Sequence, residues 1–389
     1  MQAAHMRVRR CAVLFIQAEE DLSFSLESLL RGGAGLESTL RWRVVAPHLA
    51  EKVELFDEDI SCLGKISAHY WKEVAEPSPS MLRLIKEGLI IECERYPSHA
   101  ERDQRVRDMK WWPLGAAYHF ASRWQGVDAV ASTRRQNLDT AEEMVDALGL
   151  PPSEIDRSYV GRPRIALVEV ESSKFDDGLA RRVTCRNFDS AVSISAKECS
   201  TVLKQVFGAQ ATVGVGGATF IKKNAPSAGG LHSIEPYIII QHVQDIPPAL
   251  YHYNALTHVL ELVVDEVDVY ELALRALGQQ CWFANSAVQV VLVARFERCF
   301  WKYRSHSKAY RAQILDAGHL SQLLYQAATN LGLGAFVTSA INEIDIEKMF
   351  GLDELTCGPI AICGFGPRAQ DQTVTEFDPL GEVWSRSTP

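Results

Sequence analysis

The sequence has no long uninterrupted run of apolar residues, and no stretch approaches the length of a membrane span. Near the N-terminus, the apolar run from Cys11 to Ile16 is too short for the hydrophobic part of a signal peptide. The chain also lacks an excess of positive charge, because its formal net charge is −9, whereas general nucleic-acid binding requires a basic surface. We therefore expect a cytoplasmic protein that binds neither membrane nor nucleic acid.

Paired cysteines are also missing. The nine cysteines are odd in number and scattered from Cys11 to Cys363, which is typical of reduced thiols rather than of a disulfide framework. No CxxC pair is present, and we predict no metal site. The chain has no Walker-type phosphate loop for ATP, no dinucleotide-binding fingerprint and no internal repeat.

What is present is an ordinary globular composition, with 47% hydrophobic and 23% charged residues. A chain of 389 residues is too long for one ordinary core, so two domains are expected. We place an N-terminal domain and linker at residues 1–160. We place a second domain at residues 161–389. From about residue 178 this domain alternates helices and strands, which indicates an α+β fold.

The N-terminal part has the element order of a small winged-helix unit. We predict a buried strand over Arg7–Ile16, then a short strand over Val53–Phe56 and a helix with Asp57 as its N-cap. A second helix over Met81–Lys86 and a strand over Leu89–Ile91 follow. An acidic residue offsets the basic residues of the second helix, so a peptide-docking role fits better than DNA reading.

An aromatic helix is predicted over Trp111–Arg123. We interpret it as packing its rings in an interdomain core, with His119 as a core or interface histidine rather than a catalyst. Residues 138–164, which include Pro151 and Pro152, are interpreted as a linker or wrapping arm.

Two cations and a hydroxyl alternate at Arg182, Thr184 and Arg186. In an extended segment these three side chains project to one side, where they suit a phosphate group. The alternative is a set of ordinary solvated arginines. Ser195 and Glu198 then form a capping box at the start of a helix that ends at Phe207.

The segment Pro226-Ser227-Ala228-Gly229 consists of small residues. Such a segment lets backbone amides approach a flat ring closely, as binding of a flavin requires. The alternative interpretation is a tight turn before a strand over Tyr237–His242.

An amine and a phenol stand side by side at Lys302 and Tyr303, before a long helix over Tyr310–Leu331. A lysine acts as a base when desolvation or a neighbouring cation lowers its pKa, and a tyrosine when an adjacent ammonium stabilises its phenolate. The alternative is a lysine that lies over apolar surface beside a packed tyrosine. Within the long helix, Gly318 predicts a close packing contact.

Together these segments resemble the SagB-type dehydrogenases of the nitroreductase superfamily. Those FMN enzymes oxidise azoline heterocycles in ribosomally made peptides. The resemblance implies a nitroreductase-like fold, a mainly antiparallel sheet flanked by helices, behind a small winged-helix-like domain. It also implies a homodimer with FMN at the subunit interface, a precursor-peptide substrate and a cyclodehydratase partner.

The resemblance assigns Lys302 and Tyr303 to catalysis, as the pair that assists proton removal. It implies cofactor contacts for the following residues: Arg182, Thr184, Arg186, Pro226, Ser227, Ala228, Gly229, Gln322, Gly332, Leu333, Gly334 and Arg368. The chain departs from the family pattern at His232 and Ser233, where relatives often carry an aromatic residue and a proline. The residue over the flavin ring is therefore left open.

Two other functions remain open at this point. One is a flavin reductase of the same fold that uses NAD(P)H on nitroaromatics, quinones or dehydroamino acids. The other is a non-catalytic peptide-recognition scaffold with a degenerate flavin fold. The Lys302–Tyr303 pair and the additional N-terminal domain favour the peptide dehydrogenase.

Overall fold

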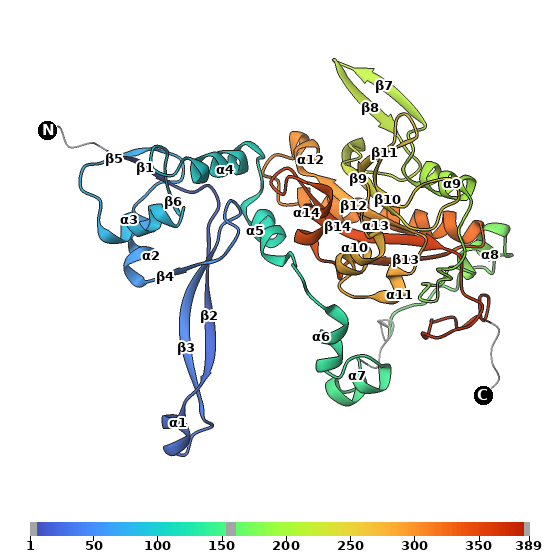
Figure 1. Cartoon of the computed structure of the whole chain (residues 1–389), viewed down its shortest axis with the longest axis horizontal. Coiled ribbons are helices and arrows are strands. Elements are labelled where there is room, and N and C mark those ends of the chain that lie inside the picture. Colours follow the sequence, from blue (N-terminus) through green and yellow to red (C-terminus); the bar gives the residue numbers. More distant parts are fainter. Residues whose placement is uncertain (1–5, 153–160, 385–389) are drawn as a thin grey trace. The chain divides into compact units, whose positions relative to one another are not determined.

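The computed structural model describes residues 6–152 and 161–384, and these residues form two compact units (Figure 1). The first unit combines the chain up to Arg123 with the two later segments 296–312 and 353–357. The second unit contains the remaining described residues, which begin at Trp124. None of the helices in the described ranges combines the length and hydrophobicity that crossing a bilayer requires.

The first unit contains two small sheets, in the strand orders β5-β1-β6 and β2-β3-β4, together with six helices of the described chain. Its elements are β1 (Met6–Arg10), β2 (Phe15–Phe24), α1 (Leu26–Leu30), β3 (Leu36–Val45), β4 (Val53–Leu55), α2 (Asp57–Gly64), β5 (Lys72–Val74), α3 (Pro79–Lys86), β6 (Ile90–Glu92), α4 (Pro97–Asp108), α5 (Pro113–Ser122) and α12 (Phe296–Lys302). Val8, Val44, Leu84 and Ile90 are fully buried and join β1, β3, α3 and β6 in one core.

The predicted single strand over Arg7–Ile16 is wrong. The chain leaves the first sheet after Arg10 and enters a second sheet at Phe15, where β2 and β3 form a long antiparallel hairpin with α1 at its tip (Figure 1). The strand, helix, helix and strand expected between residues 53 and 91 are present as β4, α2, α3 and β6.

The N-cap of α2 is Phe56 and not Asp57, which is the first helical residue. The carboxylate of Asp59 accepts a hydrogen bond from the Phe56 N–H at 2.9 Å. The side chain that satisfies the helix start therefore lies two residues later than the sequence indicated.

An aromatic cluster joins α5 to the later segment 296–312 within the first unit. The ring of Trp111 lies 4.7 Å from Phe296 and 4.6 Å from Phe300, measured between ring centroids. His119 is buried beside them, and its Nδ1 lies 2.8 Å from the hydroxyl of Tyr310. The interpretation of His119 as a core histidine is confirmed.

The second unit is built on a six-stranded sheet in the order β11-β10-β9-β12-β14-β13, in which the pairs β10–β11, β9–β10, β9–β12 and β13–β14 are antiparallel. Its elements are α6 (Ala129–Arg135), α7 (Ala141–Leu148), α8 (Lys174–Ala180), α9 (Ala196–Phe207), β7 (Ala211–Val215), β8 (Ala218–Lys222), the 3₁₀ turn η1 (Ala228–Gly230), β9 (Ile234–Ile240), β10 (Ala249–Asn254), β11 (Val259–Val264), α10 (Val269–Ala276), α11 (Cys281–Ala284), β12 (Val288–Arg295), α13 (Ala309–Asn330), β13 (Gly334–Thr338), α14 (Glu343–Phe350) and β14 (Cys357–Gly366).

The helix α13 has one buried and one exposed face. Leu324 and Ala328 are fully buried, whereas Leu315 is 58% exposed. The expected close contact at Gly318 is wrong for the described chain, because a Cβ there meets no atom within 4 Å. Gly318 lies on the exposed face, so no packing demand explains it.

The fold class is confirmed as α+β, with a separate small β/α region at the N-terminus. The helix α7 lies in the segment predicted as a linker. The predicted domain boundary at residue 160 adjoins residues 153–160, which lie outside the described chain, and it stays a prediction. The capping box of α9 is confirmed, since Ser195 Oγ accepts from the Glu198 N–H at 3.2 Å.

Candidate functional site

The segment 182–186 shows the alternation expected of a strand-like phosphate site. Val183 and Cys185 are buried, whereas Arg182, Thr184 and Arg186 are half-exposed. The segment lies beside β13, because Thr184 forms a parallel bridge with Ala335 and the Cys185 N–H donates to the Ala335 carbonyl at 2.8 Å. The three predicted phosphate ligands therefore share one face.

The two arginines of this face rest on aromatic rings. The guanidinium of Arg182 lies 5.4 Å from the ring centroid of Tyr325, and that of Arg186 lies 5.9 Å from the ring of Phe283. The hydroxyls of Thr184 and Tyr325 are 3.0 Å apart. Among residues 6–152 and 161–384, no carboxylate forms an ion pair with either guanidinium. Both cations are thus available for an anionic group, as a flavin phosphate requires.

The glycine turn Gly332–Gly334 lies beside the same segment. Gly332 adopts a positive φ of 75°, which favours glycine. A Cβ at Gly334 would lie 2.5 Å from Cys185 Sγ and 3.1 Å from Arg368 Cγ, so only glycine fits this contact. Leu333 between them is buried. The turn therefore packs its backbone against the buried side of the segment 182–186.

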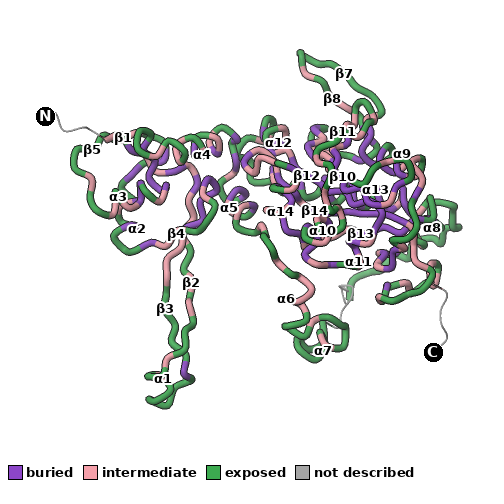
Figure 2. The backbone as a smooth tube through the Cα atoms, viewed as in Figure 1, coloured by how far each residue is buried: buried purple, intermediate pink, exposed green. Residues whose placement is uncertain are grey.

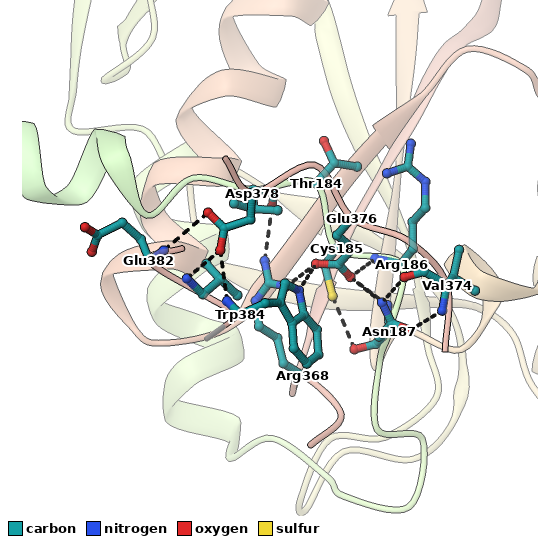
Figure 3. Close-up of polar contacts among 12 residues, drawn as sticks. Thr184, Cys185, Arg186, Asn187, Arg368, Val374, Glu376, Asp378, Glu382 and Trp384 are labelled. Atoms are coloured by element: carbon teal, nitrogen blue, oxygen red, sulfur yellow. Dashed lines mark hydrogen bonds and ion pairs between the residues drawn. The ribbon is translucent and has the colours of Figure 1, made fainter. Parts of the chain in front are cut away.

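The carboxylate of Glu376 lies at the centre of a buried polar cluster behind this segment (Figure 3). Its Oε1 accepts hydrogen bonds from the backbone N–H groups of Arg186 at 2.5 Å and Asn187 at 2.9 Å, and from Asn187 Nδ2 at 2.9 Å. Its Oε2 accepts from Arg368 Nη1 at 2.7 Å and Trp384 Nε1 at 2.8 Å. In Figure 3 the Arg186 side chain extends away from this cluster.

Burial alone raises the pKa of Glu376, but the hydrogen bonds from Trp384, Arg186 and Asn187 and the charge of Arg368 lower the pKa overall. Arg368 Nη2 also donates to the Val183 carbonyl at 3.1 Å. Both terminal nitrogens of Arg368 therefore donate hydrogen bonds to oxygens of the protein itself. Its expected contact with phosphate stays a prediction.

The loop Pro226–Gly229 is held by one side chain of α13. Asp316 accepts a hydrogen bond from Ser227 Oγ at 2.5 Å and from the Ala228 N–H at 3.0 Å. Ser227 Oγ in turn accepts from the His232 N–H at 2.9 Å. Gly229 has a positive φ of 61°, which supports its placement in a tight, closely approached turn.

A groove of about 720 Å³ lies between α8, the residues before Ser227 and the exposed face of α13. Pro226, Gly318, His319, Gln322 and Gln326 line it. The Nε2 of Gln326 is buried and has no hydrogen-bond partner among the described residues. An unsatisfied donor beside an open groove fits a bound polar group.

Lys302 and Tyr303 lie in the first unit, whereas the other predicted site residues lie in the second. Lys302 ends α12 and Tyr303 follows it, and the Tyr303 N–H donates to the Cys299 carbonyl at 3.1 Å. The Lys302 ammonium lies 5.4 Å from the centroid of the Tyr303 ring. A helix end allows both side chains to lie on one side, as a shared substrate would require.

Several residues of this site carried no sequence signal of their role. The contact of Asp316 with Ser227, across a separation of 89 residues, was not predicted. Tyr325, Asn187 and Glu376 were not identified, because their partners lie far away in the chain. Asn187 Oδ1, for example, accepts from the Val374 N–H at 2.8 Å across a separation of 187 residues.

Comparison with known proteins shows a match to the nitroreductase family over residues 179–366. A protein of Methanocaldococcus jannaschii that is named as a nitroreductase is 28% identical over 190 residues, which are 49% of this chain and 90% of that protein. The trifolitoxin-processing protein TfxB of Rhizobium leguminosarum bv. trifolii is 29% identical over 144 residues, which are 34% of this chain and 36% of that protein.

Among solved structures, one chain of the E. coli microcin synthetase McbBCD complex with truncated pro-MccB17 bound is similar to this one. The TM-score is 0.49 at 19% identity, and the match covers 69% of this chain and 94% of that chain. Residues 179–366 are thus similar to the nitroreductase family, whose members typically bind FMN. The segments at Arg182, Ser227 and Gly332 all lie within this range.

Proposed function

We propose that this chain is an FMN-dependent dehydrogenase that oxidises azoline rings in a precursor peptide to azoles. The cofactor assignment rests on one observation, which is that α13 contacts both proposed cofactor-binding segments. Asp316 holds the small-residue loop near one end of the helix, and Tyr325 supports Thr184 and Arg182 near the other. These two anchors are about 13 Å apart along the helix axis. Two separated subsites suit a cofactor with a ring at one end and a phosphate at the other.

In this proposal Arg182, Thr184 and Arg186 hold the phosphate. Backbone groups of the loop Pro226–Gly229 approach the flavin ring, and Gln322 lies along the groove between the two subsites. Gly332, Leu333 and Gly334 border the phosphate end, and Arg368 fixes the phosphate-binding segment from behind by its contacts with Glu376 and Val183.

FMN, when bound, supplies an acceptor for the hydride that leaves the azoline ring. The ring must also lose a proton, so a positioned base is required. We assign this base to the pair Lys302 and Tyr303. The Lys302 ammonium group lies 5.4 Å from the centroid of the Tyr303 ring, so a substrate carbon near one side chain is near the other. One of the two, in its deprotonated form, takes the proton from the ring carbon. Molecular oxygen is the proposed final acceptor of the two electrons.

The peptide substrate is supported by the similarity to the trifolitoxin-processing protein, whose name describes processing of a toxin. We further propose that the chain acts as a homodimer and follows a cyclodehydratase, since an azoline must form before it is oxidised. The first unit, with its winged-helix-like order of elements, is the proposed docking region for the precursor peptide.

The proposal is tested with a synthetic peptide that contains one thiazoline. Purified protein saturated with FMN should bleach when this peptide is added without oxygen, and mass spectrometry should show the loss of two hydrogens from the peptide. Protein that binds FMN but leaves the peptide unchanged would contradict the dehydrogenase assignment.

A second candidate is an NAD(P)H-dependent flavin reductase. The similarity to the nitroreductase-named protein favours it, because the match covers 90% of that protein but only 49% of this chain. Anaerobic bleaching by NAD(P)H, together with no bleaching by the azoline peptide, would establish this candidate in place of the first.

A further inference from the structure

The β2–β3 hairpin of the first unit has two chemically different faces. Side chains alternate along each strand, so the strand register defines which residues share a face. One face carries the pairs Gln17–Arg43, Glu19–Arg41, Asp21–Thr39 and Ser23–Glu37. The other face carries the pairs Ile16–Val44, Ala18–Trp42, Glu20–Leu40, Leu22–Ser38 and Phe24–Leu36.

The charged side chains of the first face form ion pairs within the hairpin and with the neighbouring strand β4. Arg41 Nε lies 2.8 Å from Asp21, and Arg43 Nε lies 2.9 Å from Glu19. Arg41 Nη1 also contacts Glu54 of β4 at 2.9 Å. Because these charges neutralise one another across the strands, this face requires no partner protein to neutralise them.

The apolar face begins in the hydrophobic core and continues beyond it. Near the body of the unit, Ile16 and Trp42 pack against the core that contains Val44. Towards the tip no other described element of the first unit covers the hairpin, and most of its residues there are coloured as exposed in Figure 2. Phe24 is 71% exposed and Leu22 is 67% exposed, and Leu36 and Leu40 are also exposed.

Exposed apolar side chains in such a continuous row are rare on a chain that acts alone. In the short helix at the tip, Leu26, Leu29 and Leu30 are exposed as well, which adds to the apolar surface at this end of the hairpin. A sheet face of this kind is normally buried against a helix or a second sheet.

The carboxylate of Glu20 indicates which kind of partner can cover this face. Glu20 lies within the apolar row, where its carboxylate accepts a hydrogen bond from Ser38 Oγ at 3.3 Å, and none of the ten residues paired across this face is basic. Two copies packed through the face would bury two carboxylates without a cation. An anionic lipid surface would meet Glu20 with repulsion.

We propose that this face docks an amphipathic helix of another protein, with a lysine or arginine of that helix placed against Glu20. The apolar side of the helix covers Leu22, Phe24, Leu36 and Leu40, and the cation removes the cost of burying the carboxylate. This surface lies wholly in the first unit and does not depend on the redox chemistry proposed above.

The test uses the full-length protein and two synthetic 18-residue amphipathic helices as probes. One probe carries a lysine at the centre of its leucine face, and the other carries a glutamate there. Fluorescence anisotropy should show about tenfold tighter binding of the lysine probe, because the charge pair becomes partly desolvated. Glu20→Gln should reduce that difference to about twofold.

The double variant Phe24→Ser/Leu40→Ser should bind neither probe, and circular dichroism should show an unchanged fold, since both side chains are exposed. Glu37→Gln, on the opposite face, is the matched control and should bind both probes as the parent does. Absence of lysine-probe binding by the parent protein would overturn the proposal. So would an oligomer that the double variant loses in sedimentation, or binding to phosphatidylglycerol vesicles that the double variant loses.

Discussion

Arg368 and Glu376 form an ion pair with an Nη1–Oε2 distance of 2.7 Å, and the carboxylate has no exposed surface. The same carboxylate accepts a hydrogen bond from the backbone N–H of Arg186, so one buried charge links the C-terminal segment to the segment 182–186, the proposed phosphate site. Glu376 is therefore a positioning residue, and it lies 190 residues away in sequence from Arg186, whose N–H it holds.

Glu376→Ala should lower the free energy of unfolding by about 3–5 kcal/mol, because it leaves the Arg368 guanidinium buried without its partner. The double variant Glu376→Ala/Arg368→Leu should regain part of that loss, since no unpaired charge remains. Denaturant titration measures both values. If the double variant is as unstable as the two single changes summed, the ion pair is not the cause.

The lowered pKa of Glu376 also predicts a pH dependence. Since the folded-state pKa lies below the ordinary glutamate value of 4.5, the carboxylate stabilises the fold above pH 4.5. This contribution is lost as the pH falls through the lower folded-state pKa. Between pH 6 and pH 3, the parent should therefore lose more stability than Glu376→Gln does.

Arg186→Ala should weaken FMN binding by about ten- to a hundredfold, the effect of losing a charge-assisted hydrogen bond of about 1.5–3 kcal/mol. Arg181→Ala is the matched control, because Arg181 is an exposed neighbour outside the predicted phosphate face. Equilibrium dialysis followed by flavin absorbance gives both dissociation constants. Equal constants in the two variants would remove Arg186 from the cofactor site.

Lys302→Met and Tyr303→Phe should leave FMN binding unchanged, because neither residue belongs to the cofactor-binding segments. Oxidation of a thiazoline peptide should slow by about 10²–10⁴-fold, the range for loss of a general base. The double variant should be little slower than the slower single variant if the pair acts as a unit. Lys308→Met, an exposed lysine nearby, is the control and should retain the parental rate.

The buried His119 of the first unit should give a second dependence of the free energy of unfolding on pH. Its burial, with a smaller contribution from Arg123, lowers the pKa of His119 to about 3 from 6.5. The unfolded chain therefore binds a proton below pH 6.5 that the folded chain does not bind. The free energy of unfolding should fall by up to about 1.4 kcal/mol per pH unit between pH 6 and pH 4.

His119→Phe should reduce this slope, whereas His69→Phe, which changes an exposed histidine, should leave it unchanged. Urea unfolding followed by tryptophan fluorescence is a suitable measurement, since Trp111 stacks on His119 at 5.7 Å. Parallel pH profiles for the parent and His119→Phe would show that other groups control the effect.

Local patterns predicted much of the fold. The capping box at Ser195 and Glu198 and the amphipathic helix Met81–Lys86 depend on neighbours in sequence, and both are present. The β2–β3 hairpin was missed because its polar face is stabilised by cross-strand pairs such as Arg41–Asp21, which only the register creates. For the same reason the sequence revealed Arg186 as a candidate but not Glu376, which binds its N–H across 190 residues.

The segment 296–312 has a consequence for the order in which the protein forms during synthesis. Phe296, Phe300 and Tyr310 complete the ring cluster around Trp111, so the first unit lacks part of its core until those residues leave the ribosome. At about 5–20 residues per second, the N-terminal part must wait on the order of ten seconds or more for them. During that interval the Trp111 surface is exposed, and a chaperone that shields aromatic residues would act there first.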